Sequence, residues 1–379
     1  MGSSLSLFNG AYRGKTVLVT GHTGFKGAWL TLWLERLGAK VVGYALKAPS
    51  EPSLFVDAKN ANHLVHVEGD VRDRQRLAQV MRDHQPDIVF HLAAQSLVRA
   101  SYEDPIETYE TNVMGTVNVL EAVRNTSSVQ ACLVITSDKC YENQEWVYSY
   151  RENDPMGGYD PYSSSKGCAE LVTSAYRRSF FHPERMDEHQ VALASVRAGN
   201  VIGGGDWALD RIVPDCMRAL MANTPIVVRN PGAIRPWQHV LEPLSGYLWL
   251  GARMLGAPAR YAEGWNFGPQ GTSNVPVQRL VETILAKWGA GDWFNPESVP
   301  QPHEAHFLKL DITKATNILE WQPVYDFMQT LETTVAWYAE YHRNPAFDAR
   351  TFTLRQIEAY EREAALRGLN WANVSCEVA

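Results

Sequence analysis

Tyr162 and Lys166 place a phenol and an amine four residues apart. On a helix such positions share one face, so both side chains can act on the same bound molecule. A free tyrosine has a pKa of about 10, and acting as a base near neutral pH requires a decrease of about 3 units. The positive charges of the lysine and of a bound cation could lower the tyrosine pKa by this amount. The spacing therefore indicates proton transfer, although chance helical pairs of this kind are common.

A hydroxyl, a carboxyl and an amine follow one another at Ser137, Asp138 and Lys139. They come directly after the apolar run 131–136, which is typical of a strand. Doubly wound sheets bind their ligands at the carboxyl ends of the strands. These three residues are therefore candidates for acid–base chemistry, whereas a surface ion pair is the other interpretation of Asp138 and Lys139.

Glycines recur with the spacing G-x-x-G-x-x-G between a predicted strand, 16–20, and a predicted helix that stops at Gly38. Glycine permits a tight turn and a close backbone approach, so the first amides of the helix can hold a dinucleotide pyrophosphate. An ordinary glycine-rich turn is the alternative. The residues predicted to bind the dinucleotide here are Gly21, Thr23, Gly24, Phe25 and Gly27.

The second predicted strand, 40–45, lacks the acidic residue that usually bonds the ribose 2′-hydroxyl of NAD. Lys47 could instead favour the 2′-phosphate of NADP, so this strand leaves the two cofactors open. Asp70 follows the third strand, where it could accept from the adenine amine or cap the next helix. His22, inside the glycine loop, could crowd the pyrophosphate.

Alternating apolar runs and amphipathic stretches must position these groups. This rhythm predicts an α/β fold with a Rossmann-type, doubly wound parallel sheet, and a smaller, mostly C-terminal α/β lobe for the substrate. The predicted strands are 16–20, 40–45, 64–68, 87–93, 131–136 and 191–196. The rhythm is lost after Gly199. We expect a dinucleotide domain of 11–198 plus about 236–270, a substrate lobe of 199–235 plus 271–345, and a helical tail of 346–379.

Composition excludes several classes of function. The formal net charge of −7 comes without the basic block that grips nucleic acid, and no apolar run approaches the length of a membrane span. Five cysteines without CxxC spacing predict neither a disulfide framework nor a zinc site and favour the cytoplasm. His303 and His306 lack the spacing of a zinc protease, so we expect no metal.

Taken together, these motifs resemble the nucleotide-sugar 4,6-dehydratases of the extended short-chain dehydrogenase/reductase superfamily. The likeness extends over nearly the whole chain and is most specific for the branch that acts on CDP-glucose. The stretches that carry it are 21–27, 91–95, 137–141, 156–162, 197–207 and 235–240.

The resemblance implies that NAD takes hydride from C4 of the hexose, water leaves across C5 and C6, and hydride returns to C6. It assigns substrate polarisation to Ser137 and the acid for the leaving hydroxyl to Asp138. The family's base is a glutamate, whereas this chain has Lys139. Lys139 is either the base, if burial removes its proton, or a cation that stabilises the C5 enolate.

The resemblance also carries implications for the fate of the product, for the assembly and for the residues that bind each ligand. It implies that the product enters deoxysugar synthesis of the O-antigen type. Asn112 would support the tyrosine helix, and 112–123 and 162–180 would pair in a homodimer or homotetramer. The residues assigned to NAD are Asp70, Val71, Leu92, Ala93, Ala94, Tyr162 and Lys166, and those assigned to the sugar nucleotide are Gln95, Ser96, Asn200, Arg211, Arg229, Arg235 and His303.

Two other functions compete with dehydration. A 4-epimerase or reductase on the same scaffold would not need the acid and amine that follow Ser137. A catalytically silent dinucleotide-binding regulator would not need Tyr162 and Lys166.

Overall fold

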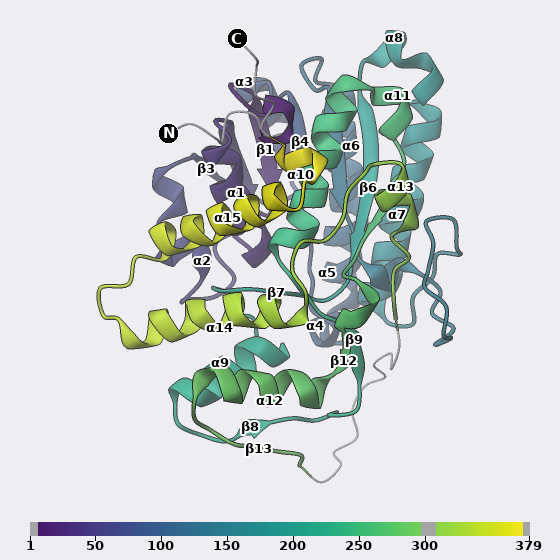
Figure 1. The fold of residues 1–379 in the computed structure, drawn as a ribbon. Coiled ribbons are helices and arrows are strands. Elements are labelled where there is room, and N and C mark those ends of the chain that lie inside the picture. The colour runs from purple at the N-terminus through teal and green to yellow at the C-terminus, as the bar shows by residue number, and fades with distance from the viewer. Residues whose placement is uncertain (1–6, 297–307, 374–379) are drawn as a thin grey trace.

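A seven-stranded parallel sheet forms the centre of the molecule (Figure 1). The computed structural model describes residues 7–296 and 308–373. The strand order is β11-β6-β5-β4-β1-β2-β3, and every neighbouring pair is parallel, which confirms the predicted doubly wound sheet. The strands are β1 (Thr16–Thr20), β2 (Lys40–Ala45), β3 (Val65–Glu68), β4 (Ile88–His91), β5 (Ala131–Ile135), β6 (Ala192–Ala198) and β11 (Gly264–Phe267).

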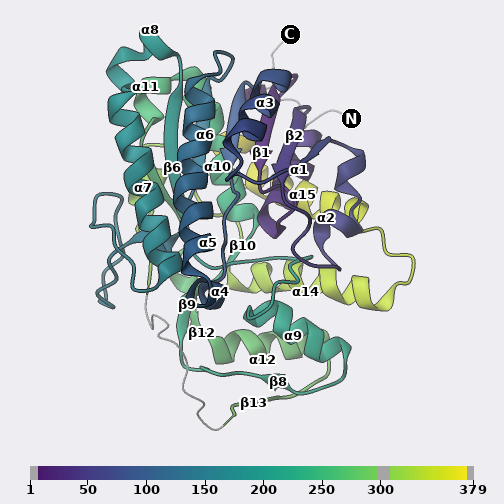
Figure 2. The ribbon, with the colours of Figure 1, turned by 180° about the vertical axis from the view of Figure 1, so that it is seen from behind.

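Helices cover both faces of this sheet, which explains why its inner strands are apolar runs rather than alternating patterns. Seen from behind, one layer lies in front of the strands (Figure 2). It packs Leu77 and Leu120 against Leu18 and Val89. This layer contains α3 (Arg74–His84), α6 (Gly115–Arg124) and α7 (Pro161–Ser179), and the opposite layer contains α1 (Phe25–Arg36), α10 (Leu241–Gly256) and α15 (Ala349–Leu366).

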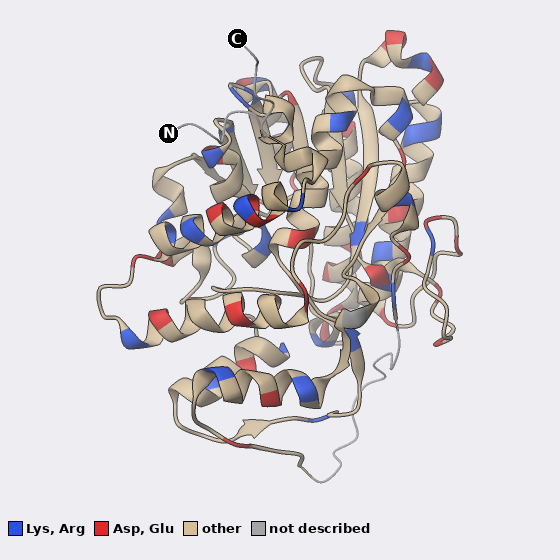
Figure 3. Cartoon of the chain, viewed as in Figure 1, with Lys and Arg blue, Asp and Glu red and all other residues tan. Residues whose placement is uncertain are grey.

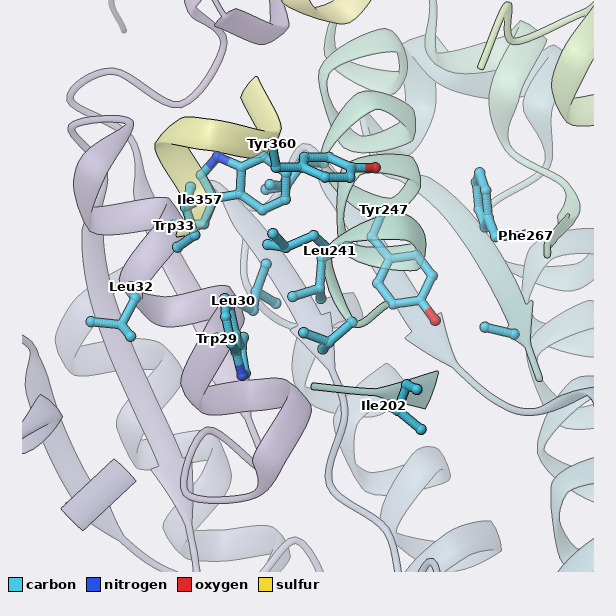
Figure 4. Close-up of a cluster of buried hydrophobic side chains, with 14 of the residues drawn as sticks. Trp29, Leu30, Leu32, Trp33, Ile202, Leu241, Tyr247, Phe267, Ile357 and Tyr360 are labelled. Carbon is cyan, nitrogen blue, oxygen red and sulfur yellow. The ribbon is translucent and has the colours of Figure 1, made fainter. Parts of the chain in front are cut away.

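Helix α1 is buried on all sides from Gly27 to Leu34, because it lies between the sheet and α15. Trp29 and Trp33 are completely buried there, in a cluster that includes Tyr247 of α10 and Tyr360 of α15 (Figure 4). A helix of this composition requires neighbours on every side. The helix ends as predicted, because Gly38 adopts a positive φ of 83°.

The smaller lobe lies beyond the carboxyl ends of the strands (Figure 1). Short strands join its segments: β9 pairs with β12, β13 with β8, and β10 with β7. The lobe contains α9 (Ile212–Met221), β8 (Ile226–Val227), β9 (Ile234–Pro236), β12 (Asn274–Pro276), α12 (Val277–Trp288) and β13 (Trp293–Phe294), while β7 (Val201–Ile202), β10 (Gln238–His239) and α14 (Phe327–Arg343) connect it to the sheet.

The segment after residue 308 packs against both parts of the molecule, since α14 lies against α12 of the smaller lobe while other residues contact the sheet domain. Helix α13 (Thr313–Asn317) contacts β11, and the Trp321 indole donates to the Ser245 hydroxyl of α10 at 2.9 Å. The sequence-based division assigns residues 271–345 to the substrate lobe. The buried ring of Trp321 also meets Phe267 of β11 edge-on.

The remaining helices are short. They are α2 (Leu54–Asp57), α4 (Val98–Glu103), α5 (Pro105–Tyr109), a π-helical turn (Glu110–Met114), α8 (Met186–His189) and α11 (Pro258–Tyr261). Figure 3 shows basic and acidic residues interspersed on outer helices such as α12, α14 and α15, while the central strands carry few charges. Among the described helices, none is both long and apolar enough to cross a bilayer.

Candidate active site

A cavity of about 1210 Å³ lies between the carboxyl ends of the strands and the smaller lobe. Residues that follow six of the seven strands form one wall, and residues of α9 and β8–β9 form the other. The predicted site residues that line it are Gly21, Thr23, Gly24, Phe25, Gly27, Asp70, Val71, Leu92, Ala93, Ala94, Ser96, Ser137, Asp138, Lys139, Tyr162, Lys166, Asn200, Arg211, Arg229 and Arg235.

Helix α7 positions the tyrosine and the lysine. Its first turn is fixed by Asp160, whose carboxylate accepts from the Ser163 amide at 2.9 Å, and by Pro161 at the first helical position. Tyr162 and Lys166 then face the cavity from one side of the helix. The Lys166 amine donates to the carbonyl of Ile135 at 3.4 Å, which fixes it against the end of β5.

Burial favours the neutral form of both side chains. The pKa of Tyr162 is raised to about 12, chiefly by burial with a contribution from the nearby Asp138, while a hydrogen bond with Ser137 and the charge of Arg211 oppose the increase. Burial lowers the pKa of Lys166 to about 8 despite the nearby carboxyl of Glu170. Tyr162 is therefore a phenol in the ligand-free protein, and its ionisation requires an additional positive charge in the cavity.

Ser137, Asp138 and Lys139 open onto the same cavity as the tyrosine and lysine. The Ser137 hydroxyl donates to Asp138 Oδ1 at 3.0 Å. Burial raises the pKa of Asp138, while Lys139 and Ser137 act in the opposite direction. Gly199 lies next to this carboxyl, and a Cβ there would come within 2.9 Å of Asp138 Oδ2. A buried carboxyl is thus held in the same cavity as a phenol and an amine.

The glycine loop fits a dinucleotide. A Cβ at Gly21 would lie 2.6 Å from the Ala93 nitrogen, and one at Gly27 would lie 2.3 Å from the Gly21 carbonyl oxygen, so packing excludes side chains there. Gly24 faces the cavity, and a Cβ there would meet only the Gly21 oxygen, at 3.4 Å. Packing therefore leaves room at Gly24, at the start of α1, where a pyrophosphate can approach the helix amides.

The adenosine end of the cavity is less specific. Asp70 accepts from the Arg72 amide at 2.8 Å and from its guanidinium at 2.7 Å, so its carboxylate is already engaged. Lys47 is exposed on the cavity wall. His22 is completely buried and does not line the cavity; its ring occupies the space left by Gly43 and hydrogen bonds to His66 at 2.7 Å. It therefore does not crowd the pyrophosphate.

Arginines line the opposite wall. Arg211 donates to Asp206 at 3.0 Å and to Ser96 at 3.3 Å, while Arg229 donates to Asp210 at 3.1 Å. Arg235 reduces the pKa of Asp138 by its charge. The three guanidinium groups and the amide of Asn200 can bind an acidic ligand that enters from this side.

Gln95 differs from its prediction. It does not line the cavity, because its side-chain amide donates to the Leu97 carbonyl in the loop after β4 and to the Thr108 hydroxyl of α5. Asn112 confirms its predicted role, since it donates to Ser165 of α7 at 2.8 Å. His303 lies outside the described residues. Within 7–296 and 308–373, no group of three His, Cys, Asp or Glu side chains could hold a metal.

Two cavity features were not anticipated from the sequence. Lys26 lines the cavity from the first turn of α1, and its amine donates to the Tyr247 hydroxyl of α10 at 3.4 Å. In the sequence, the signal that could have indicated Lys26 is a charged residue between two glycines of the loop. Tyr247 gave no such signal, because a tyrosine in an apolar helix is typical of core packing.

The fold and this site define a dinucleotide-binding enzyme with a tyrosine–lysine pair. A family model described as GDP-mannose 4,6 dehydratase matches residues 18–250. The chain belongs to this family. It is 52% identical over 349 residues to a CDP-glucose 4,6-dehydratase of Salmonella typhimurium, covering 92% of this chain and 97% of the relative. A dTDP-glucose 4,6-dehydratase of Xanthomonas campestris is 27% identical over 346 residues, covering 85% of this chain and 93% of the relative.

Solved structures share the architecture. An epimerase of Methanothermobacter thermautotrophicus superposes with a TM-score of 0.75 at 25% identity and covers 89% of this chain and 95% of its own. A dTDP-glucose 4,6-dehydratase of Streptomyces venezuelae, solved with NAD bound, has a TM-score of 0.71 at 24% identity and covers 86% of this chain and 97% of its own. These comparisons confirm the predicted fold class and the resemblance to nucleotide-sugar 4,6-dehydratases.

Proposed function

We propose that this protein is an NAD-dependent CDP-glucose 4,6-dehydratase, a hydro-lyase that forms CDP-4-keto-6-deoxyglucose and water. One observation carries the proposal: Tyr162 and Lys166 share a cavity with Ser137, Asp138 and Lys139. An epimerase needs the first pair alone, whereas loss of water also needs a proton donor for the leaving hydroxyl. The 52% identity to a CDP-glucose 4,6-dehydratase supports the choice of substrate.

Each group has one task in this proposal. Tyr162 takes the proton of the sugar C4 hydroxyl, and Lys166 stabilises the resulting phenolate. NAD, when bound, supplies a reversible hydride acceptor and a positive charge that lowers the pKa of Tyr162. Asp138 protonates the C6 hydroxyl as it leaves. Lys139 either removes the C5 proton or stabilises the enolate by its charge, because its half-buried position permits both roles.

The remaining cavity residues bind the two ligands. The glycine loop and the residues after β3 and β4 hold NAD, and Ser96, Asn200, Arg211, Arg229 and Arg235 hold the sugar and its diphosphate. His303 is assigned to the substrate by resemblance alone. The keto-deoxy product would enter deoxysugar synthesis of the O-antigen type.

The protein would act in the cytoplasm as a homodimer or a homotetramer. The four described cysteines are free thiols, which suits a reducing compartment. Leu171 of α7 and Met114 before α6 are 60% and 52% exposed on the layer that faces the viewer in Figure 2. Apolar residues on neighbouring helices favour a second copy as the partner.

The test is a screen of CDP-, dTDP-, GDP- and UDP-hexoses with mass detection of products. We expect CDP-glucose to yield a product lighter by one water, and the Tyr162→Phe variant to yield none. Tyr159→Phe, at a phenol that is 76% exposed, is the matched control and should retain activity. A C4 epimer without a change in mass would reject dehydration, and a preference for another nucleotide would reject the cytidine substrate.

A further inference from the structure

The buried amine of Lys166 is held in the cavity wall by a backbone carbonyl. Lys166 is 5% exposed, and its amine donates to the carbonyl oxygen of Ile135, the last residue of β5, at 3.4 Å. Such bonds usually measure about 3.0 Å, so this contact is weak by itself. The place of the amine therefore depends on how firmly the Ile135 carbonyl is fixed.

The direction of this carbonyl is set by the next residue, Thr136. The Ile135 carbonyl and the Thr136 amide belong to one peptide unit, which is planar, so the direction of the N–H determines that of the C=O. The Thr136 amide donates to the carbonyl oxygen of Val196 on β6 at 2.9 Å, and the Thr136 hydroxyl lies 3.2 Å from the same oxygen. Fixing Thr136 thus fixes the acceptor of the Lys166 amine.

The Thr136 hydroxyl also connects this peptide to α7, the helix that carries Lys166. It donates to Glu170 Oε1 at 2.5 Å. Glu170 lies one turn after Lys166, on the same face of α7. Its other oxygen accepts from the Ser195 hydroxyl at 2.7 Å and from the Arg197 guanidinium at 2.8 Å, both on β6. The carboxylate is therefore a buried anchor for the hydroxyl.

Two contacts one turn apart therefore join one face of α7 to the end of β5. We propose that Thr136 is a positioning residue for the reaction: bound to Glu170, its hydroxyl fixes the Ile135–Thr136 peptide and, with it, the place of the Lys166 amine in the cavity. The inference rests on the proposed function, in which Lys166 stabilises the phenolate of Tyr162. Thr136 lines the cavity, but its hydroxyl is directed at Glu170 and β6, so it acts through Lys166.

The proposal concerns the place of the amine rather than its charge. Glu170 also acts on that charge, since its carboxylate opposes the loss of the Lys166 proton that burial favours. Thr136→Val separates the two effects, because it removes the hydroxyl at nearly the same shape and leaves Glu170 and its ion pair with Arg197 in place. An effect of charge alone predicts no change in this variant.

The first test does not depend on turnover. Carbon-13 relaxation of lysine Cε in the ligand-free protein measures the order of the Lys166 side chain, whose signal is identified by its loss in Lys166→Arg. We expect the order parameter to fall in Thr136→Val and to stay at the wild-type value in Thr136→Ser, which keeps the hydroxyl. Thr136→Cys, whose thiol is a weak donor, should give an intermediate loss, and it provides the same comparison if Thr136→Val does not fold.

Thr173→Val is the matched control, an identical change at a completely buried hydroxyl of α7 that donates to the Ala169 carbonyl at 2.7 Å. It should leave the order of Lys166 unchanged. An order parameter that is unaltered in Thr136→Val, or that falls equally in Thr173→Val, would overturn the positioning role whatever the substrate proves to be.

The second test is kinetic. With CDP-glucose, we expect kcat of Thr136→Val to fall by roughly 10- to 10²-fold, the scale of a misplacement of about 1 Å, with KM unchanged. Thr136→Ser should regain most of the rate, and Thr173→Val should lose little. In a Lys166→Met background, Thr136→Val should cause no further loss, because it acts through the missing amine.

An equal loss with and without Lys166, or a rise in KM in place of the fall in kcat, would show that Thr136 acts elsewhere and would overturn the proposal. If the wild type dehydrates no sugar nucleotide, the proposed function fails. The relaxation experiment then still decides whether Thr136 fixes the Lys166 amine, so the two failures can be told apart.

Discussion

At the scale of single residues, the proposed reaction depends on one buried carboxyl, that of Asp138. Asp138 is held between the Ser137 hydroxyl and the backbone at Gly199, and burial raises its pKa. This direction favours the protonated form that a proton donor for a leaving hydroxyl requires, compared with an exposed aspartate. The acid is therefore produced by its environment rather than by its residue type.

The Asp138→Asn variant should stop the reaction after the sugar is oxidised. Tyr162 and Lys166 remain intact, so hydride still leaves C4, but the C6 hydroxyl lacks its proton donor. We expect product formation to fall by about 10²- to 10⁴-fold. Reduced nicotinamide should accumulate, which absorbance spectroscopy measures. Asp187→Asn, on the exposed surface of α8, is the control, and an oxidation step that is lost as well would contradict the assignment.

At the scale of secondary structure, α7 presents three chemical groups at intervals of one turn. Glu170 follows Lys166 on the same face and accepts from Thr136, from Ser195 at 2.7 Å and from Arg197 at 2.8 Å. These bonds attach the helix to the ends of β5 and β6. Because the arginine and the carboxyl are both buried, the pair is satisfied only while the helix keeps its place.

The Glu170→Ala variant should destabilise the protein by about 3 to 5 kcal/mol, because it leaves a buried Arg197 without its carboxylate. Denaturant unfolding measures this free energy. Glu188→Ala, which removes an exposed partner of Arg185 on α8, should cost less than about 1 kcal/mol. Similar losses in the two variants would show that the buried network does not fix α7.

A π-helical turn, Glu110–Met114, also positions α7. It contains Asn112, whose amide donates to Ser165 of α7 and to the Gln95 carbonyl, and whose oxygen accepts from the Gln95 amide at 2.9 Å. Turns of this kind are frequent at functional sites. Here the turn connects the loop after β4 to the helix that carries the tyrosine.

At the scale of the whole molecule, one buried carboxyl joins the C-terminal helix to the sheet domain. Glu242 of α10 accepts from the amides of Val324 and Tyr325 at 2.8 and 2.6 Å and from the Tyr360 hydroxyl of α15 at 2.8 Å. Burial raises the pKa of Glu242 to about 7. Its ordinary value is 4.5.

The folded protein therefore binds this proton more tightly than the unfolded chain does. The resulting stability is complete below about pH 4.5 and is lost as the pH rises towards 7. Glu242→Gln cannot titrate, so relative to this variant the wild type should lose up to about 3 kcal/mol between pH 5 and pH 8. Urea unfolding at both pH values measures the difference, with exposed Glu188→Gln as control. A difference independent of pH would contradict it.

Assembly belongs to the same scale. Leu171→Glu places a charge on the exposed apolar face of α7, so it should dissociate the proposed homodimer without unfolding the chain. Light scattering after size exclusion measures the mass in solution. Glu188→Lys, on exposed α8, is the control. A wild type that is monomeric, or a Leu171→Glu variant with unchanged mass, would reject this interface.

The sequence by itself determined six of the seven strands of the sheet, the glycine loop and the spacing of Tyr162 and Lys166, while the edge strand β11 was not predicted. These features depend on local periodicity, turn chemistry and helical repeat, which neighbouring residues encode. Only the tertiary structure decided that the side-chain amide of Gln95 hydrogen bonds to Leu97 and Thr108 and does not face the cavity. The same holds for the position of Lys26 in the cavity wall. The tertiary structure likewise decided that Glu242 joins segments more than 80 residues apart. Such contacts depend on which surfaces pack together, and the pattern within any one segment does not carry that information.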